Sequence, residues 1–332
     1  MEKQLLIVPD SLANESFDGY VVVSNRSLAA GNHVHNPWPP VSDLRRLIEE
    51  YACTAVAVTF EPNADAVQRL VAARSGSTPD VAKQIVFADA GIPVDLRKTF
   101  PAALLPILQR VLPCDLIELS TAAIQDSVPT ASMPAALLRG DVKSSVVETS
   151  PSIDRFPAAG PAAFGADCGL SSDLLSKAVD HALADVQLAA SDRKCVTAGV
   201  LLLWDFLDAS HEISQTMEGR GTPRTGDYWH GIMHRREPDA GNASYWFRRL
   251  GVHPAFASLS SHLDRWMKET GASDAECKLV SEQVNADGRF DPFAMIELST
   301  KAIRKPRQLE DSTLRRVQYL EILNLLSASF DA

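Results

Sequence analysis

The chain has 332 residues, of which 45% are apolar and 22% charged, and its formal net charge is −10 at pH 7. That length and composition fit a globular protein of one large domain or two smaller ones. The acidic balance disfavours a nucleic-acid binder, because affinity for phosphate needs a basic surface. The five cysteines are scattered without CxxC spacing, as in proteins of a reducing compartment. The longest apolar stretch, residues 196–207, is shorter than the roughly 20 residues that cross a bilayer. We therefore expect a cytoplasmic protein that binds neither nucleic acid nor membrane.

The first third of the chain alternates short apolar runs with segments of helical spacing. Strands are expected at residues 5–8, 20–23, 54–60 and 84–88, and a helix at 41–51. Asn63 is an expected N-cap for a helix through Ala72. Strands that alternate with helices favour an α/β layer with parallel strands. Amphipathic helices are expected at 104–111 and 116–124, and we assign residues 1–125 to a small α/β domain.

Residues 126–172 are rich in Pro, Ser, Ala and Gly, which favours a crossover or linker, with one short strand at 144–149. Residues 173–332 have helical patterns throughout. Helices are expected at 174–190, 195–217, 227–236, 239–251, 253–270, 274–285, 292–302 and 309–330. The predicted fold class is therefore mixed, a small α/β N-terminal domain followed by a mainly α-helical C-terminal domain.

Residues 227–254 concentrate the residue types that carry chemistry. This segment holds three histidines, four arginines and two Tyr-Trp pairs. A surface does not need so many aromatic rings, and a core does not tolerate so many charges and imidazoles. A mixture of both kinds is typical of a segment that lines a pocket. The sequence therefore predicts that the functional site lies in the helical domain.

His230 and His234 are the strongest candidates for a metal site. They lie four residues apart on an expected helix, so both rings project from one face, and Glu237 continues that face. A His-x3-His pair with a carboxylate forms half of a zinc or iron site, which His211 or Asp208 could complete. Glycine takes the place of the catalytic Glu of the His-Glu-x-x-His motif. Metal-free acid–base or ligand contacts, and buried structural hydrogen bonds, stay open as alternatives.

Arginines and aromatic residues surround these histidines and are candidate substrate contacts. A guanidinium group can grip a carboxylate or phosphate with two hydrogen bonds. The same arginines could instead pair with nearby acids and join helices. The aromatic rings could stack on a ligand or belong to the core. The candidate substrate-binding residues are Tyr228, Trp229, Arg235, Arg236, Asn242, Tyr245, Trp246, Arg248 and Arg249.

The run Trp-His-Gly-Ile-Met-His-Arg-Arg-Glu-Pro-Asp-x-x-Asn-Ala-x-Tyr-Trp-Phe-Arg-Arg-x-Gly-x-His-Pro occupies residues 229–254. It resembles the signature of a family of bacterial and fungal proteins that has no established activity. The upstream pattern Trp-Asp-Phe-Leu-Asp-x-x-His at residues 204–211 fits the same family. The resemblance implies that these residues form one site, and it implies no particular reaction.

These patterns predict an enzyme that acts on a small polar anionic metabolite, such as a sugar acid or a phosphorylated compound. Its catalytic residues would be His211, His230, His234, Asp208 and Glu237. A histidine would serve as general base, or the three histidines would bind a divalent metal, zinc or iron. Hydrolysis, isomerisation and elimination all fit. The sequence has no nicotinamide or nucleotide fingerprint. A non-catalytic small-molecule-binding module and a helical protein–protein interaction domain are the alternatives, and a homodimer stays open.

Overall fold

The computed structural model describes residues 4–8, 10–24, 41–59, 63–75, 91–108, 116–119, 144–148, 156–161 and 171–330. The chain forms two compact units. The α/β unit comprises Met1–Ala90, Leu105–Ser152 and Ala166–Ala178, and the helical unit comprises Gly91–Leu104, Ile153–Gly165 and Val179–Ala332. The predicted fold class, a small α/β region followed by a mainly helical region, is confirmed. Two short segments before residue 173 belong to the helical unit.

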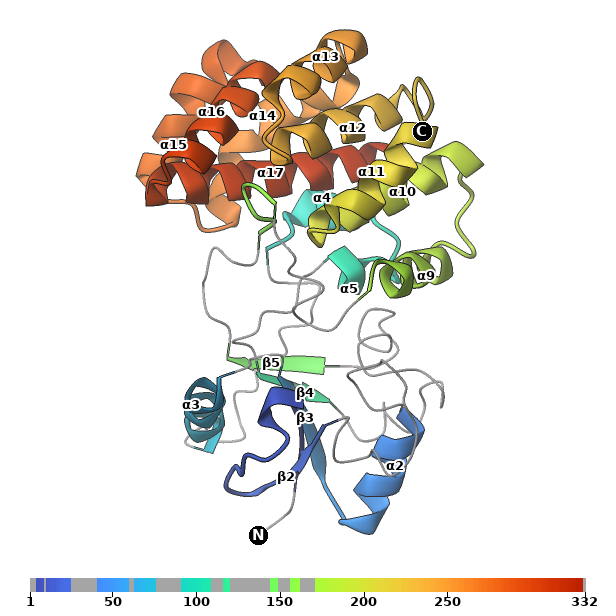
Figure 1. Cartoon of the computed structure of the whole chain (residues 1–332), viewed down its shortest axis with the longest axis vertical. Helices are drawn as coiled ribbons and strands as arrows, with labels where there is room; N and C mark the ends of the chain where they lie inside the picture. The colour runs from blue at the N-terminus through green and yellow to red at the C-terminus, as the bar shows by residue number, and fades with distance from the viewer. Residues whose placement is uncertain are drawn as a thin grey trace. The chain divides into compact units, whose positions relative to one another are not determined.

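The α/β unit contains a five-stranded sheet in the order β2-β1-β3-β4-β5 (Figure 1). The strands are β1 Gln4–Ile7, β2 Tyr20–Val23, β3 Ala55–Thr59, β4 Leu116–Leu119 and β5 Ser144–Glu148. Strand β1 pairs in parallel with β2 and β3. Strand β4 is antiparallel to both β3 and β5, so the expectation of parallel strands was wrong for this half of the sheet. The strand expected at 84–88 lies outside the described residues.

The helix expected at 116–124 was also wrong where the structure describes it, because residues 116–119 form β4. Hydrophobic periodicity does not distinguish a strand from a buried helix over so short an apolar run. What decides the conformation is pairing with β3, where Ala57 lies opposite Glu118. That partner is about sixty residues away in the sequence, so no local sequence pattern predicts the pairing.

Helices α2 (Val41–Glu50) and α3 (Ala64–Ser75) belong to the same unit as the sheet. The expected cap of α3 is confirmed, because Asn63 Oδ1 accepts hydrogen bonds from the backbone N–H groups of Asp65 and Ala66. Val67 and Val71 of α3 belong to a buried cluster with apolar residues of β1 and β3. All four residues from Leu5 to Val8 are buried, as in a strand covered on both faces. Short helical segments occur at η1 Asp10–Leu12 and α5 Leu105–Leu108.

The C-terminal region is a set of packed helices (Figure 1). In chain order they are α9 Ser172–Ala182, α10 Ala190–Leu203, α11 Leu207–Thr216, α12 Thr225–Arg236, α13 Ala240–Leu250, α14 Pro254–Glu269, α15 Asp274–Leu279, η5 Val280–Val284, η6 Ala286–Gly288, α16 Pro292–Arg304 and α17 Gln308–Ala328. Helix α4 (Val94–Thr99) belongs to the same unit. The longest helix, α17, contacts α4, α10, α14, α15 and α16. Among the helices of the described ranges, none has the length and apolar content needed to cross a membrane.

The single helix expected at 195–217 is two helices, which corrects the prediction. Helix α10 ends at Leu203 and α11 begins at Leu207. Between them Asp205 has a left-handed backbone with φ 65°, which interrupts the helical path. The buried Asp205 carboxylate forms an ion pair with Arg236 and accepts a hydrogen bond from the Ala158 backbone N–H. The break therefore turns an acidic side chain inward to meet a buried arginine, a reason that the local sequence does not reveal.

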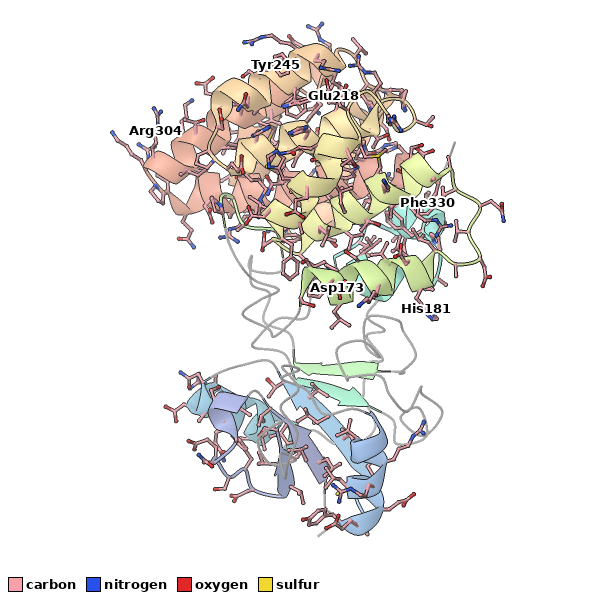
Figure 2. The ribbon with its side chains drawn as sticks, turned by 45° about the vertical axis from the view of Figure 1, so that its right-hand side comes forward. Asp173, His181, Glu218, Tyr245, Arg304 and Phe330 are labelled. Carbon is pink, nitrogen blue, oxygen red and sulfur yellow. The ribbon has the colours of Figure 1, made fainter. Side chains whose placement is uncertain are left out.

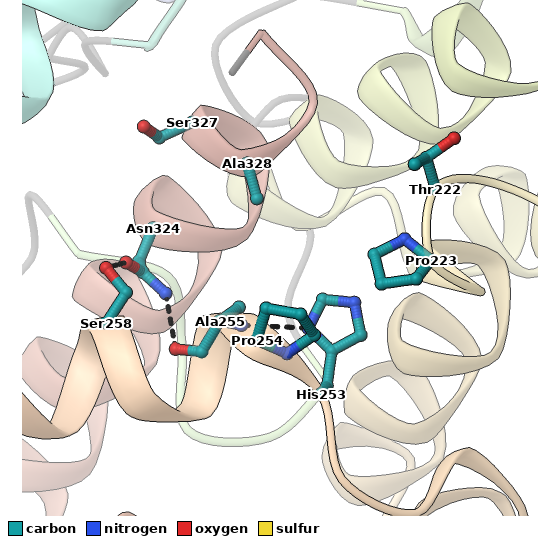
Figure 3. A pocket seen from close by; sticks show the side chains of 9 residues that line it. All are labelled: Thr222, Pro223, His253, Pro254, Ala255, Ser258, Asn324, Ser327 and Ala328. Atoms are coloured by element: carbon teal, nitrogen blue, oxygen red, sulfur yellow. Dashed lines mark hydrogen bonds between the residues drawn. The ribbon is translucent and has the colours of Figure 1, made fainter. Parts of the chain in front are cut away.

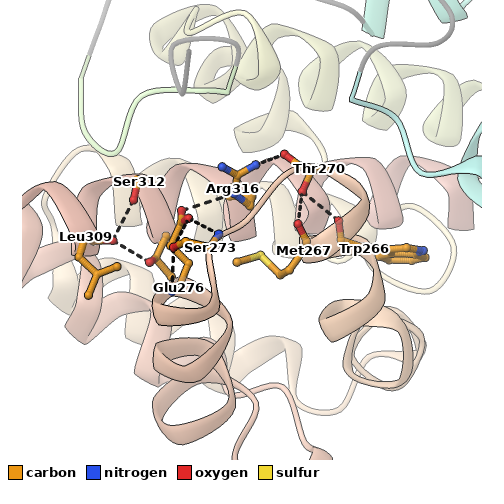
Figure 4. A network of polar contacts seen from close by, with 9 residues as sticks. Trp266, Met267, Thr270, Ser273, Glu276, Leu309, Ser312 and Arg316 are labelled. Carbon is orange, nitrogen blue, oxygen red and sulfur yellow. Dashed lines mark hydrogen bonds and ion pairs between the residues drawn. The ribbon is translucent and has the colours of Figure 1, made fainter. Parts of the chain in front are cut away.

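A polar network fixes α14, α15 and α17 to one another (Figure 4). Ser273 and Glu276 form a reciprocal capping box at the start of α15. Arg316 of α17 donates to the Thr270 backbone carbonyl and lies 3.5 Å from Glu276 Oε1. Its guanidinium also lies 4.9 Å from the centre of the Phe156 ring. One arginine thus links the last helix to the α14–α15 turn and to residues 156–161.

Candidate metal centre

Helices α11 and α12 bring three imidazoles together. His211 comes from α11, and His230 and His234 lie one turn apart on α12. One ring nitrogen from each lies within 4.8 Å of the others, and in the described part of the chain this is the one such convergence of three or more metal-ligating side chains. The Nε2 atoms of His211 and His230 are 3.1 Å apart. The three histidines predicted from the sequence as metal ligands are therefore neighbours in space.

The cluster lies just beneath the surface of the helical unit. His230 and His234 are buried, whereas His211 is half-buried. The exposed side-chain amide of Gln215, one turn further along α11, lies 2.8 Å from His211 Nε2. Solvent can therefore reach His211, the outermost of the three rings, from the α11 side. Helical spacing alone places Gln215 on the same face of α11 as His211, four residues further along the chain.

Glu237 holds the ring of His234. Its Oε2 atom lies 3.0 Å from His234 Nδ1, just beyond the last residue of α12. A carboxylate in this position accepts the Nδ1–H hydrogen bond and leaves the Nε2 electron pair free. Metal-ligating histidines are commonly oriented by such a carboxylate.

The environment of the cluster keeps the buried imidazoles neutral. Burial, with a smaller contribution from the neighbouring His234 and His211, lowers the pKa of His230 to about 3. Burial also lowers the pKa of His234, although Glu237 opposes that shift. Neutral imidazole is the form that binds a metal ion. The Nδ1 atom of His230 is buried without a hydrogen-bond partner, which is unusual for a histidine retained for structural hydrogen bonds.

Of the four aromatic candidates, Trp246 lies at the cluster. Its ring is stacked on His230 with a centroid separation of 4.0 Å, and His230 is stacked on His234 at 4.8 Å. The Arg249 guanidinium lies 5.2 Å from the Trp246 ring centre. Tyr245 packs edge-on against Trp246 and is exposed on the surface (Figure 2). Trp246 thus forms a wall of the site, and Tyr245 lies further out.

The other aromatic pair belongs to the core. Tyr228 is fully buried, and its hydroxyl donates to Glu321 Oε1 at 3.0 Å. Trp229 is also fully buried and packs so closely on α10 that only glycine fits at residue 199. The structure therefore does not bring Tyr228 or Trp229 to the histidine cluster as ligand contacts.

Two of the four candidate arginines are occupied by buried ion pairs. Arg235 pairs with Glu321 of α17, with NH2 2.5 Å from Oε2, and Arg236 pairs with Asp205 and donates to the Leu202 carbonyl at 2.7 Å. All four of these charged side chains are almost completely inaccessible. Of the two uses that the sequence left open for these arginines, joining helices is the one that this structure contains.

The remaining candidates lie nearer the surface. Arg249 pairs with Glu218, and its Nε atom is 3.7 Å from a buried Asp227 carboxylate oxygen. Arg248 is exposed and lies over Phe293, with its guanidinium 5.9 Å from the ring centre. Asn242 donates to the Asp239 carboxylate at the start of α13, so it takes part in the helix cap. Asp208 is exposed, and no hydrogen bond or ion pair between described residues joins it to the histidines.

No protein-family model, curated protein or solved structure matches the chain. The chemistry of the site is therefore inferred from its own residues. Three converging imidazoles, two of them buried, and a carboxylate that orients one of them are features that a three-histidine metal site would have.

Proposed function

We propose that His211, His230 and His234 bind a divalent metal ion, Zn²⁺ or Fe²⁺, and that the protein is a metal-dependent enzyme. The observation that carries this proposal is the convergence of three ring nitrogens within 4.8 Å, two of them 3.1 Å apart. Zinc–nitrogen bonds of about 2.0–2.1 Å in a tetrahedral site separate the nitrogens by roughly 3.4 Å. The His211–His230 pair is thus close to a ligand separation, and a small closure of the third ring would complete the set.

The residues around the cluster support this role. Glu237 fixes the tautomer of His234, and Gln215 contacts the most accessible imidazole, His211. Trp246 covers one face of His230 and excludes water from it. A bound metal ion would polarise a substrate oxygen and lower the pKa of a coordinated water to about 7. Hydrolysis is the reaction that this chemistry supports most directly, and isomerisation or elimination needs the same polarised oxygen.

We retain a small polar anionic metabolite, a sugar acid or phosphorylated compound, as the proposed substrate class. Because Arg235 and Arg236 are paired internally, the metal ion itself would supply most of the positive charge that attracts the anion. Arg249 adds a second, partly exposed cation on the Trp246 side. Because the chain has a net charge of −10, it repels anions on average, and an anionic ligand needs a local positive charge to bind.

A second candidate function is favoured by the same 3.1 Å contact. His211 Nε2 and His230 Nε2 can share a proton without any metal ion, and the Gln215 amide lies beside them. His211 would then act as a general acid or base toward a bound molecule, or the cluster would belong to a non-catalytic binding module.

Metal binding distinguishes the two candidates. We expect the purified 332-residue chain to bind one Zn²⁺ or Co²⁺ per molecule, measured by elemental analysis and by the visible absorption of the cobalt form. His230→Ala and His234→Ala should each lose the bound ion. The matched control is His181→Ala, since His181 is exposed on α9 (Figure 2). A folded wild-type protein without measurable affinity for Zn²⁺ would overturn the metal proposal, as would a folded His234→Ala variant with unchanged affinity.

Activity is tested on the metal-loaded protein. Hydrolysis of p-nitrophenyl phosphate and p-nitrophenyl acetate should require the metal, be abolished by dipicolinate and return when Zn²⁺ is added back. If both compounds are hydrolysed at rates independent of metal content, the metal-free acid–base candidate is favoured instead.

A further inference from the structure

A cavity of about 370 Å³ lies away from the histidine cluster (Figure 3). Its walls come from the start of α14, the end of α17 and residues 222–223 that precede α12. All of these residues belong to the helical unit. The volume falls at the lower end of the roughly 300–1,000 Å³ that is usual for small-molecule sites.

His253 is among the residues that line this cavity, and its ring carries a hydrogen-bond donor without a partner. Its Nδ1 atom accepts a hydrogen bond from the Ala255 backbone N–H at 3.1 Å, so the side chain caps α14. In the neutral ring the proton is then on Nε2. The Nε2 atom is buried without a hydrogen-bond partner, and the residue as a whole is 1% exposed. Burial lowers the pKa of His253 to about 4, so this neutral donor persists at physiological pH.

The other buried polar groups around His253 are already satisfied. Asn324 donates to the Ala255 carbonyl at 2.8 Å and accepts from the Ser258 hydroxyl at 2.9 Å. The Phe256 backbone N–H donates to the His253 carbonyl. Among the residues that line the cavity, His253 Nε2 is the one buried side-chain nitrogen or oxygen left without a partner. An unpaired buried donor is unfavourable, so a ligand acceptor at this point would gain a hydrogen bond that the protein alone does not make.

We propose that this cavity binds a small uncharged molecule through a hydrogen bond from His253 Nε2 to a carbonyl oxygen. The ligand is uncharged because no Lys, Arg, Asp or Glu lines the cavity, and an ion would be left there without a counter-charge. Pro223, Pro254 and Ala328 offer apolar contacts to the rest of such a molecule. The proposal is independent of the metal centre, since none of its residues belongs to the histidine cluster.

Two probe molecules of nearly the same shape test the proposed hydrogen bond in the 332-residue chain. Cyclopentanone carries the carbonyl acceptor, whereas methylenecyclopentane has nearly the same shape without it. In protein labelled with ¹⁵N-histidine, cyclopentanone should shift the His253 Nε2–H signal with saturation. We expect the hydrocarbon to bind at least tenfold more weakly. Equal affinity for both probes, or no saturable shift with cyclopentanone up to its solubility, would overturn the proposal.

Two substitutions separate the donor from the cavity. His253→Asn keeps a side-chain oxygen to cap α14 and removes the Nε2 donor, so it should weaken cyclopentanone binding at least tenfold. Ala328→Leu should fill the cavity and prevent binding, and its matched control is Ala257→Leu at an exposed position of α14. Unchanged affinity in a folded His253→Asn variant contradicts the assigned donor. If Ala328→Leu does not fold, the probe comparison in the wild-type protein still decides.

Discussion

His234 Nδ1 and Glu237 Oε2 are 3.0 Å apart, with the histidine inside the last turn of α12 and the glutamate at its C-cap. Because both residues are fixed by the end of one helix, the orientation of the His234 ring is set before any ligand binds. The bond directs one ring nitrogen to the carboxylate and leaves the other without this partner, as the proposed metal site requires. Removal of this carboxylate should therefore reduce the affinity for a metal ion more than it reduces the free energy of unfolding.

Glu237→Gln should weaken Zn²⁺ binding by about 10- to 100-fold, the range found for partners that orient metal ligands. The amide keeps the size of the side chain but accepts the Nδ1–H bond without a negative charge. Competition with a fluorescent zinc chelator measures the affinity. Glu212→Gln is the control, since it removes one negative charge from an exposed position of α11. Equal zinc affinities in the two variants would show that Glu237 does not act on the metal site.

The buried ion pair between Asp205 and Arg236 gives a prediction about stability. Arg236→Met leaves the Asp205 carboxylate buried without its counter-charge, and we expect a loss of about 3–5 kcal/mol in the free energy of unfolding. Adding Asp205→Asn removes that charge, keeps a side-chain oxygen for the Ala158 N–H and suits the left-handed backbone. The double variant should be more stable than Arg236→Met alone in urea denaturation.

The exposed Arg248 supplies the comparison for this experiment. Arg248→Met should change the free energy of unfolding by no more than about 0.5 kcal/mol, as is usual for surface positions. An Arg236→Met variant as stable as Arg248→Met would contradict the role described for the buried Asp205–Arg236 ion pair.

The features predicted from the sequence are those with local causes. The cap at Asn63 depends on backbone groups two or three residues away, and it is confirmed. The His230–His234 face follows from helical spacing alone. A region of helices after residue 173 follows from periodicity that extends over many turns.

The features that the sequence did not predict depend on partners far along the chain. Glu321, the partner of Arg235, lies 86 residues away, and no pattern joins the two. The helix break at Asp205 has no Gly or Pro to mark it in the sequence. We attribute the break to the ion pair between Asp205 and Arg236, which is a tertiary contact. Strand β4 likewise depends on its pairing with β3. The sequence therefore indicated which histidines lie together, while the pairing of Arg235 and Arg236 with buried acids could be seen only in the fold.

The close approach of α10 and α12 predicts an unusual effect of alanine at residue 199. Gly199 lies inside α10, where alanine would ordinarily favour the helix. A Cβ atom there would lie 2.5 Å from Trp229 Cζ2 and 2.9 Å from Leu326 Cδ2, both inside the core. We expect Gly199→Ala to lower the free energy of unfolding by about 1–3 kcal/mol because the core is overpacked.

Gly241 is the matched control for Gly199. It lies in the first turn of α13, and the nearest atom to a Cβ there is Asp239 Oδ1 at 3.4 Å. Gly241→Ala should be neutral or stabilise the protein by up to about 1 kcal/mol. Thermal and urea denaturation of both variants give the comparison, and equal effects would contradict the packing described for Trp229.

The burial of His253 predicts how stability depends on pH. The pKa of its imidazole is about 4 in the folded protein, against an ordinary value of 6.5, because burial disfavours the charged ring. As pH falls below 6.5 the unfolded chain binds a proton on this residue and the folded chain does not, so stability is lost between about pH 6.5 and 4. The loss is at most about 1.4 kcal/mol per pH unit from this one group.

His253→Asn should therefore have a shallower fall in stability between pH 6.5 and 4.5 than the wild-type protein, measured by urea denaturation at each pH. His181→Asn, at an exposed position, should retain the wild-type slope. If both variants lose stability with the same slope as wild type, His253 is not held neutral by the fold.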